Sequence, residues 1–125
     1  MGKIASFREL RVYIQAMDAA MEIFDVTKTF PADEKFSLTD QIRRSSRGVC
    51  ANIGEAWHKR RYEKHFVSKI TDASMEASET RVWLDIAIQC NYIQQDTFDT
   101  LDAKYGLILA QLVTMESRPQ DWIIK

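Results

Sequence analysis

Residues 7–30 read FRELRVYIQAMDAAMEIFDVTKTF, and two apolar series run through this stretch. Both repeat at steps of three and four residues, which is the repeat of a packed helix seam. The first series consists of Phe7, Leu10, Ile14, Met17, Met21 and Phe24. The second consists of Val12, Ala16, Ala19, Ile23, Val26 and Phe30. The stretch therefore predicts one long helix with two apolar seams.

The two seams lie on nearly opposite sides of this helix, because each residue adds about 100° of rotation. A four-helix bundle covers only one side of each of its helices, so the second seam needs a different partner. One interpretation is a contact between subunits, with an oligomer interface formed by Val12, Ala16, Ala19, Ile23 and Val26. The other places the helix at the centre of its own bundle. The pattern alone leaves both open.

Three further runs have the same helical repeat, and short links near 31–36, 57–62 and 92–95 connect them. Short links favour antiparallel neighbours in up-down order. We therefore expect an all-α chain that forms one domain over residues 1–125 and folds as an antiparallel up-down four-helix bundle. Its helices are predicted near residues 7–30, 38–57, 62–92 and 96–116.

Composition supports this class and excludes others. The 125 residues are 46% hydrophobic and 28% charged with only four Gly and two Pro, which argues against disorder and against a turn-dense β-sandwich. Cys50 and Cys90 are far apart and are expected to be buried free thiols. No apolar run approaches the roughly 20 residues of a membrane helix, and no signal-peptide pattern occurs, so we expect a cytoplasmic protein with no membrane partner.

Enzyme chemistry has little support. His58 and His65 are the only histidines, and both lie among Lys and Arg residues, as solvated surface histidines do. Glu55 and His58 have the Glu-x-x-His spacing of di-iron bundles, but that architecture needs the motif twice. No glycine-rich phosphate-binding motif is present. We predict no enzyme, no metal and no other cofactor, and a metal-dependent bundle enzyme is the disfavoured alternative.

The stretch LTDQIRRSSRGVCANIGEAW at 38–57 resembles the four-helix-bundle proteins encoded in 23S ribosomal RNA intervening sequences. FRELRVY at 7–13, FVSKI at 66–70 and WLDIA at 83–87 agree with that family in order and spacing. The resemblance implies an antiparallel up-down four-helix bundle that assembles as a homopentameric ring. This fold is shared with the accessory proteins of diversity-generating retroelements. No known reaction is implied, so we expect a non-enzymatic protein whose main partner is itself and whose physiological role is unknown.

Charge is unevenly distributed along the chain. Residues 41–70 hold eight Lys and Arg against two Glu, a local net charge of +6. Since the whole chain carries −1, the rest carries −7. The cationic turn between the second and third helices is a candidate contact for the phosphates of RNA or single-stranded DNA, through Lys59, Arg60, Arg61 and Lys64. Such binding should be weak, because the remaining surface repels polyanions.

The arginines of the second helix have a second interpretation, which we favour. Asp40 and Arg44 are spaced for an i, i+4 ion pair, and Arg43 or Arg47 could pair with Glu76 or Glu79 of the adjacent helix. This predicts a structural polar cluster of Asp40, Arg43, Arg44, Arg47, Glu55, Glu76 and Glu79. Three aromatic residues near the cationic turn are likewise better explained as anchors of the core or an interface than as a platform for bases, namely Trp57, Tyr62 and Phe66.

Overall fold

The computed structural model describes residues 3–124, which form four α-helices and three short 3₁₀ turns. The helices are α1 (Arg11–Thr27), α2 (Leu38–His58), α3 (Glu63–Gln89) and α4 (Gln95–Ser117). The turns are η1 (Phe7–Glu9), η2 (Ala32–Glu34) and η3 (Pro119–Asp121). No strand occurs in this part of the chain, so the prediction of an all-α chain with four helices is confirmed.

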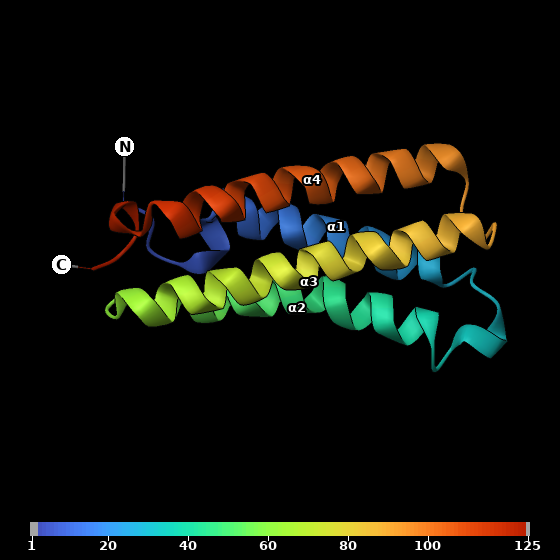
Figure 1. The fold of residues 1–125 in the computed structure, drawn as a ribbon, viewed down its shortest axis with the longest axis horizontal. Helices are drawn as coiled ribbons and strands as arrows, with labels where there is room; N and C mark the ends of the chain where they lie inside the picture. Colours follow the sequence, from blue (N-terminus) through green and yellow to red (C-terminus); the bar gives the residue numbers. More distant parts are fainter. Residues whose placement is uncertain (1–2, 125) are drawn as a thin grey trace.

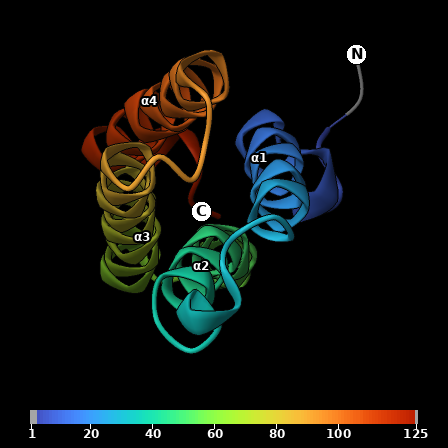
Figure 2. The same cartoon turned by 90° about the vertical axis from the view of Figure 1, so that its right-hand side faces the viewer.

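The four helices lie side by side along one long axis (Figure 1). Successive helices run along this axis and back, so the α2–α3 turn lies at the same end as the two termini. Viewed along the axis, the helices follow one another around a shared core in chain order (Figure 2). The most extensive packing joins α2 to α3, whereas α1 packs on α2 and α4. Thus α1 and α3 lie across the bundle from each other.

The first helix is shorter than its predicted range of 7–30. Leu10 has an extended conformation (φ −65°, ψ 130°) that separates η1 from α1 and lets its side chain reach the core. At the other end the Thr27 hydroxyl donates to the Ile23 carbonyl at 2.7 Å, and the chain then turns toward η2. The other three helices begin and end within three residues of their predicted bounds.

The two seams of α1 differ in burial. The seam assigned to a subunit interface is buried within the single chain at Val12, Ala16, Ala19 and Ile23, and its Val26 is half-buried against the same core. This corrects the interface prediction. Small side chains at Ala16 and Ala19 let α1 pack closely on its neighbours, so this seam faces the bundle. The other seam is exposed at its centre, where Ile14, Met17 and Met21 retain 54%, 39% and 51% of their accessible surface.

Small residues also shape the contact between α2 and α3. Ser45 and Thr80 are buried there, and their hydroxyl oxygens lie 2.8 Å apart in a hydrogen bond. A Cβ atom at Gly48 would overlap a carboxylate oxygen of Glu76. Glycine therefore leaves room for the Glu76 side chain to lie across α2.

Paired substitutions test which seam of α1 faces the core. Ile23→Asp should unfold the chain at a cost of several kcal/mol, because Ile23 is 1% exposed and a carboxylate there would lose its water. Met21→Asp, two positions away on the exposed seam, should keep the native helical signal and melt well above Ile23→Asp, because Met21 is 51% exposed in the single chain. Thermal unfolding followed by circular dichroism compares the two, and equal melting temperatures would contradict this assignment of the seams.

Candidate functional site

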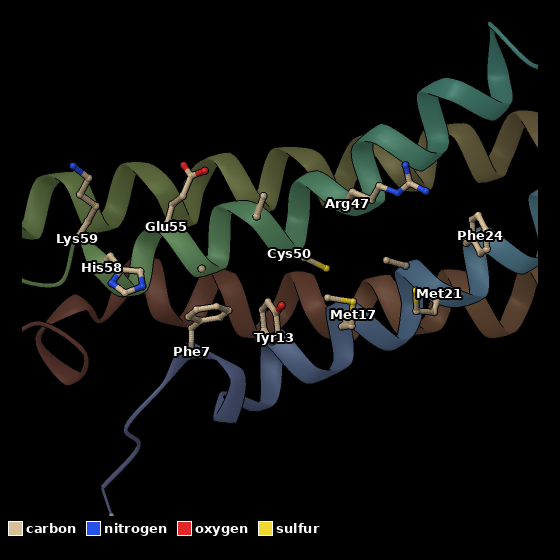
Figure 3. Close-up of a pocket in the computed structure, with 13 residues that line it drawn as sticks. Phe7, Tyr13, Met17, Met21, Phe24, Arg47, Cys50, Glu55, His58 and Lys59 are labelled. Carbon is tan, nitrogen blue, oxygen red and sulfur yellow. The ribbon is translucent and has the colours of Figure 1, made fainter.

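An apolar groove of about 960 Å³ runs along the molecule between α1 and α2 (Figure 3). One wall comes from α1, with Tyr13, Met17, Ala20, Met21 and Phe24. The other comes from α2 and the residue after it, with Arg47, Cys50, Ala51, Gly54, Glu55, His58 and Lys59. Phe7 from η1 completes the lining. The floor of the groove consists of the small residues Ala20, Cys50, Ala51 and Gly54, so the groove follows from the way α1 and α2 pack.

Aromatic side chains fix both ends of the groove. At one end the Phe7 ring lies over Gly54, where a Cβ atom would meet the ring at 3.7 Å, and it meets Tyr13 edge-on with ring centroids 5.0 Å apart. At the other end the Arg43 guanidinium lies 4.9 Å from the centroid of the Phe24 ring. Between these fixed ends lie the methionines, whose unbranched thioether side chains adapt to different partners.

The rim of the groove carries excess positive charge. Arg47 and Lys59 line it from α2 and its C-terminal end, together with His58. The acidic residue of the lining, Glu55, accepts a hydrogen bond from Lys69 of α3 at 2.7 Å, which raises the pKa of Lys69 and neutralises the carboxylate. An apolar floor with a cationic rim is typical of a surface that binds another macromolecule.

The predicted polar cluster does not come together. Arg43 turns toward α1, where its Nε donates to the Thr27 hydroxyl at 2.8 Å. Glu79 accepts from the indole of Trp83 at 3.2 Å. No ion pair within residues 3–124 joins Asp40 to Arg44, nor Arg43 or Arg47 to Glu76 or Glu79, so both predicted pairings are wrong. The reason is the orientation of α2, which turns Arg43 and Arg47 toward α1.

Glu76 forms no ion pair with α2 among the described residues, but the charge of Arg44 on α2 acts on its carboxylate from a greater distance. Its carboxylate is partly buried over Gly48. Burial and the neighbouring Glu79 raise the pKa of Glu76, and the positive charge of Arg44 opposes that shift. Glu76 is thus influenced by the charge of Arg44, and not by the predicted pairing with Arg43 or Arg47.

The cationic turn is only partly available to a ligand. Lys59, Arg61 and Lys64 are exposed and take part in no ion pair among the described residues. Arg60 differs, since its guanidinium stacks 3.4 Å from the centroid of the Trp57 ring and its Nε donates to the Trp57 carbonyl at 2.8 Å. Burial lowers the pKa of Arg60. Arg60 therefore holds the turn in place, which corrects its assignment as an exposed contact.

The aromatic residues near this turn divide in the same way. Trp57 and Phe66 are buried in the core, as their helical spacing suggested. Tyr62 is exposed and lies beside the His65 ring, with centroids 5.7 Å apart. The exposed cations of the turn therefore have one solvent-facing aromatic neighbour.

Possible metal ligands are dispersed. Throughout residues 3–124, no three His, Cys, Asp or Glu side chains gather closely enough to hold a metal ion. Glu55 is engaged by Lys69, and the His58 ring packs edge-on against Phe7 with centroids 6.0 Å apart. Within the same residues, no helix has the length and apolar character to cross a bilayer.

A family profile for 23S rRNA-intervening sequence proteins matches residues 8–114, which include α1 to α3 and most of α4. The chain belongs to this family. The match confirms the resemblance seen at 7–13, 38–57, 66–70 and 83–87, and it contains every groove residue except Phe7.

A solved structure supports the same relationship for this 23S rRNA-intervening sequence protein. It is a protein of unknown function from the S23 ribosomal protein family of Bacteroides thetaiotaomicron VPI-5482, 27% identical to this chain. The two superpose with a TM-score of 0.76 over 84% of this chain and 97% of the other. Among curated proteins, no sequence matches the chain.

The cysteines of this 23S rRNA-intervening sequence protein offer a chemical probe of the groove. Cys50 is buried in the groove floor, whereas Cys90 is exposed after α3, contrary to the expectation that both thiols are buried. Burial raises the pKa of Cys50 to about 11. Because the thiolate is the reactive form, Cys50 is almost entirely protonated and inert near neutral pH.

An aromatic disulfide reagent at pH 8 should therefore modify Cys90 quickly and Cys50 slowly. In a Cys90→Ser variant the rate at Cys50 should rise about tenfold for each pH unit below its pKa, because the thiolate fraction rises by that factor. Both thiols should react at once in guanidinium chloride. A Cys50 thiol that reacts as fast as Cys90 in the folded protein would contradict its place in the groove floor.

Proposed function

We propose that this protein is a non-enzymatic building block, an antiparallel up-down four-helix bundle that assembles with copies of itself as a homopentameric ring. The observation that supports assembly is the α1–α2 groove, with Met17 and Met21 half-exposed at its centre and Ile14 beside them. Covering this apolar surface with a second chain would remove it from water, and the hydrophobic effect favours that contact in proportion to the area covered.

The chemistry of the groove favours assembly over catalysis. Its cysteine is Cys50, whose raised pKa makes the thiol a poor nucleophile. Its histidine, His58, packs on Phe7, and its carboxylate, Glu55, is paired with Lys69. A catalytic nucleophile needs a base within hydrogen-bond reach, whereas the Cys50 thiol donates to the Ser46 carbonyl. A cytoplasmic location belongs to the same proposal and is consistent with two free cysteines.

Light scattering coupled to size-exclusion chromatography tests the assembly. We expect a stable species of about five times the 14.5 kDa chain mass, unchanged on moderate dilution. A species with the mass of one chain at all concentrations would contradict the proposal, and a different multiple would retain assembly but reject the pentamer.

A second candidate function is weak binding of RNA or single-stranded DNA. The observation that favours it is the group of exposed cations at the α2–α3 turn, Lys59, Arg61 and Lys64, which form no ion pair within residues 3–124. A ring would bring several copies of this group together, and multivalent contacts can raise the overall affinity without any new contact. Contacts to phosphates do not read sequence, so little base preference is expected.

A gel-shift titration with single-stranded RNA and DNA tests this candidate. We expect a complex at about 50 mM salt that weakens steeply toward about 200 mM, because binding releases counterions from the phosphates. Arg61→Gln and Lys64→Gln together should weaken it strongly, and Lys59 is left unchanged because it also lines the groove. The matched control removes two exposed charges elsewhere, with Lys35→Gln and Arg44→Gln, and should retain it. No complex at low salt with tens of micromolar protein would exclude this function.

A further inference from the structure

A second apolar stripe on the molecule is left without a partner, and it lies on α3. Met75, Val82 and Ile86 are 63%, 51% and 39% exposed. They are spaced by seven and four residues, so they point to the same side of the helix. No described element of the chain covers this side, and α3 lies across the bundle from the α1 side of the groove (Figure 2). The α3 stripe is therefore an apolar surface separate from the groove.

The charges around the two surfaces have opposite sign. Exposed carboxylates flank the α3 stripe at Asp72, Glu79 and Asp85. The cation in this part of α3, Arg81, is bound to Asp102 of α4 by hydrogen bonds of 2.8 and 3.0 Å. The stripe is thus framed by negative charge, whereas the groove is framed by Arg47 and Lys59.

The two surfaces also match in length and in the placement of their charges. Met75 to Ile86 spans about 16 Å of helix, and Tyr13 to Phe24 spans the same length along the groove. The groove has a cation toward each end, with Arg47 near Met21 and Lys59 near His58 (Figure 3). The stripe has an acid at each end, Asp72 and Asp85.

We infer that the α1–α2 groove of one copy receives the outer face of α3 of a second copy, an inference that rests on the self-assembly proposed above. Each chain then gives one surface and receives the other, so the contact is heterologous. Heterologous contacts build rings when the rotation between copies closes, and open filaments when it does not. In each contact, one chain uses its groove and the other uses its α3 face. The unused surface of each chain is then free to bind the next copy, as a ring requires.

The exposed side of α4 also carries apolar side chains, and it fits the groove less well. Leu107 and Val113 are 64% and 50% exposed there. The nearby cation, Lys104, is bound to Asp18 and Glu22 of α1. This face therefore offers no row of acids to oppose Arg47 and Lys59, and it supplies a matched control.

Three double variants test the contact by complementation. The groove variant carries Met17→Glu and Met21→Glu, the α3 variant carries Val82→Glu and Ile86→Glu, and the control carries Leu107→Glu and Val113→Glu. All six positions are exposed in the single chain, so each variant should fold, as the helical circular dichroism signal would verify. Mass is measured by light scattering for each variant alone and for an equimolar mixture of the groove and α3 variants.

The groove and α3 variants should each have the mass of one chain, whereas the control should keep the mass of the unchanged protein. The mixture should contain a species of twice the 14.5 kDa chain mass, because one intact groove and one intact α3 face remain. An α3 variant that keeps the full mass, a mixture that stays monomeric, or a control that dissociates would overturn this inference. An unchanged protein that is itself monomeric would instead refute the self-assembly on which it rests.

Discussion

The close approach of α1 to the bundle through Ala16 and Ala19 determines most of what this molecule presents to its surroundings. Both side chains are fully buried, and larger residues there would hold the helix away from its neighbours. Because an apolar seam this narrow can face only one direction, the opposite seam with Met17 and Met21 must face out. The groove beside α2 is therefore the counterpart of the packing that stabilises the fold.

Charge then distinguishes the surfaces that packing leaves exposed. Internal partners neutralise several charged side chains, as in the pairs Lys69–Glu55 and Arg81–Asp102. Within residues 3–124, no ion pair engages Arg47 and Lys59 at the groove or Asp72, Glu79 and Asp85 beside the α3 stripe. Exposed pairs add little stability, but unpaired charges of opposite sign on two surfaces steer the surfaces together and penalise contacts between like surfaces.

The sequence allowed much of the fold to be predicted but less of the site. Regular apolar spacing located all four helices, and the motif at 38–57 pointed to the family that the profile match confirms. The extended residue Leu10, which separates η1 from α1, was not predicted. Phe7, Leu10 and Ile14 keep the 3–4 spacing of a helix in the sequence, so the pattern does not mark where the helix begins. The inward seam of α1 was misassigned because both seams have the same period, and only packing decides between them.

The polar contacts were harder to predict for a related reason. Arg43 can reach either neighbouring helix, and the position of Phe24 and Thr27 on α1 decides the direction it takes. Arg60 was expected in solvent because it stands in a run of cations, but the Trp57 ring beside it offers a stacking surface. The groove becomes visible only from the exposed fractions of Met17 and Met21. Those fractions depend on how the helices pack, which the spacing of apolar residues does not give.

Oxidation of methionines by hydrogen peroxide, followed by peptide mass spectrometry, tests most directly whether a second copy covers the groove. Met17, Met21 and Met75 are exposed in the single chain, and Met115 is buried and serves as an internal reference. At concentrations where the protein is assembled, the account predicts that the first three oxidise nearly as slowly as Met115, and that they become fast on dilution or dissociation into single chains. Fast oxidation of Met17 and Met21 in the assembled protein would contradict it.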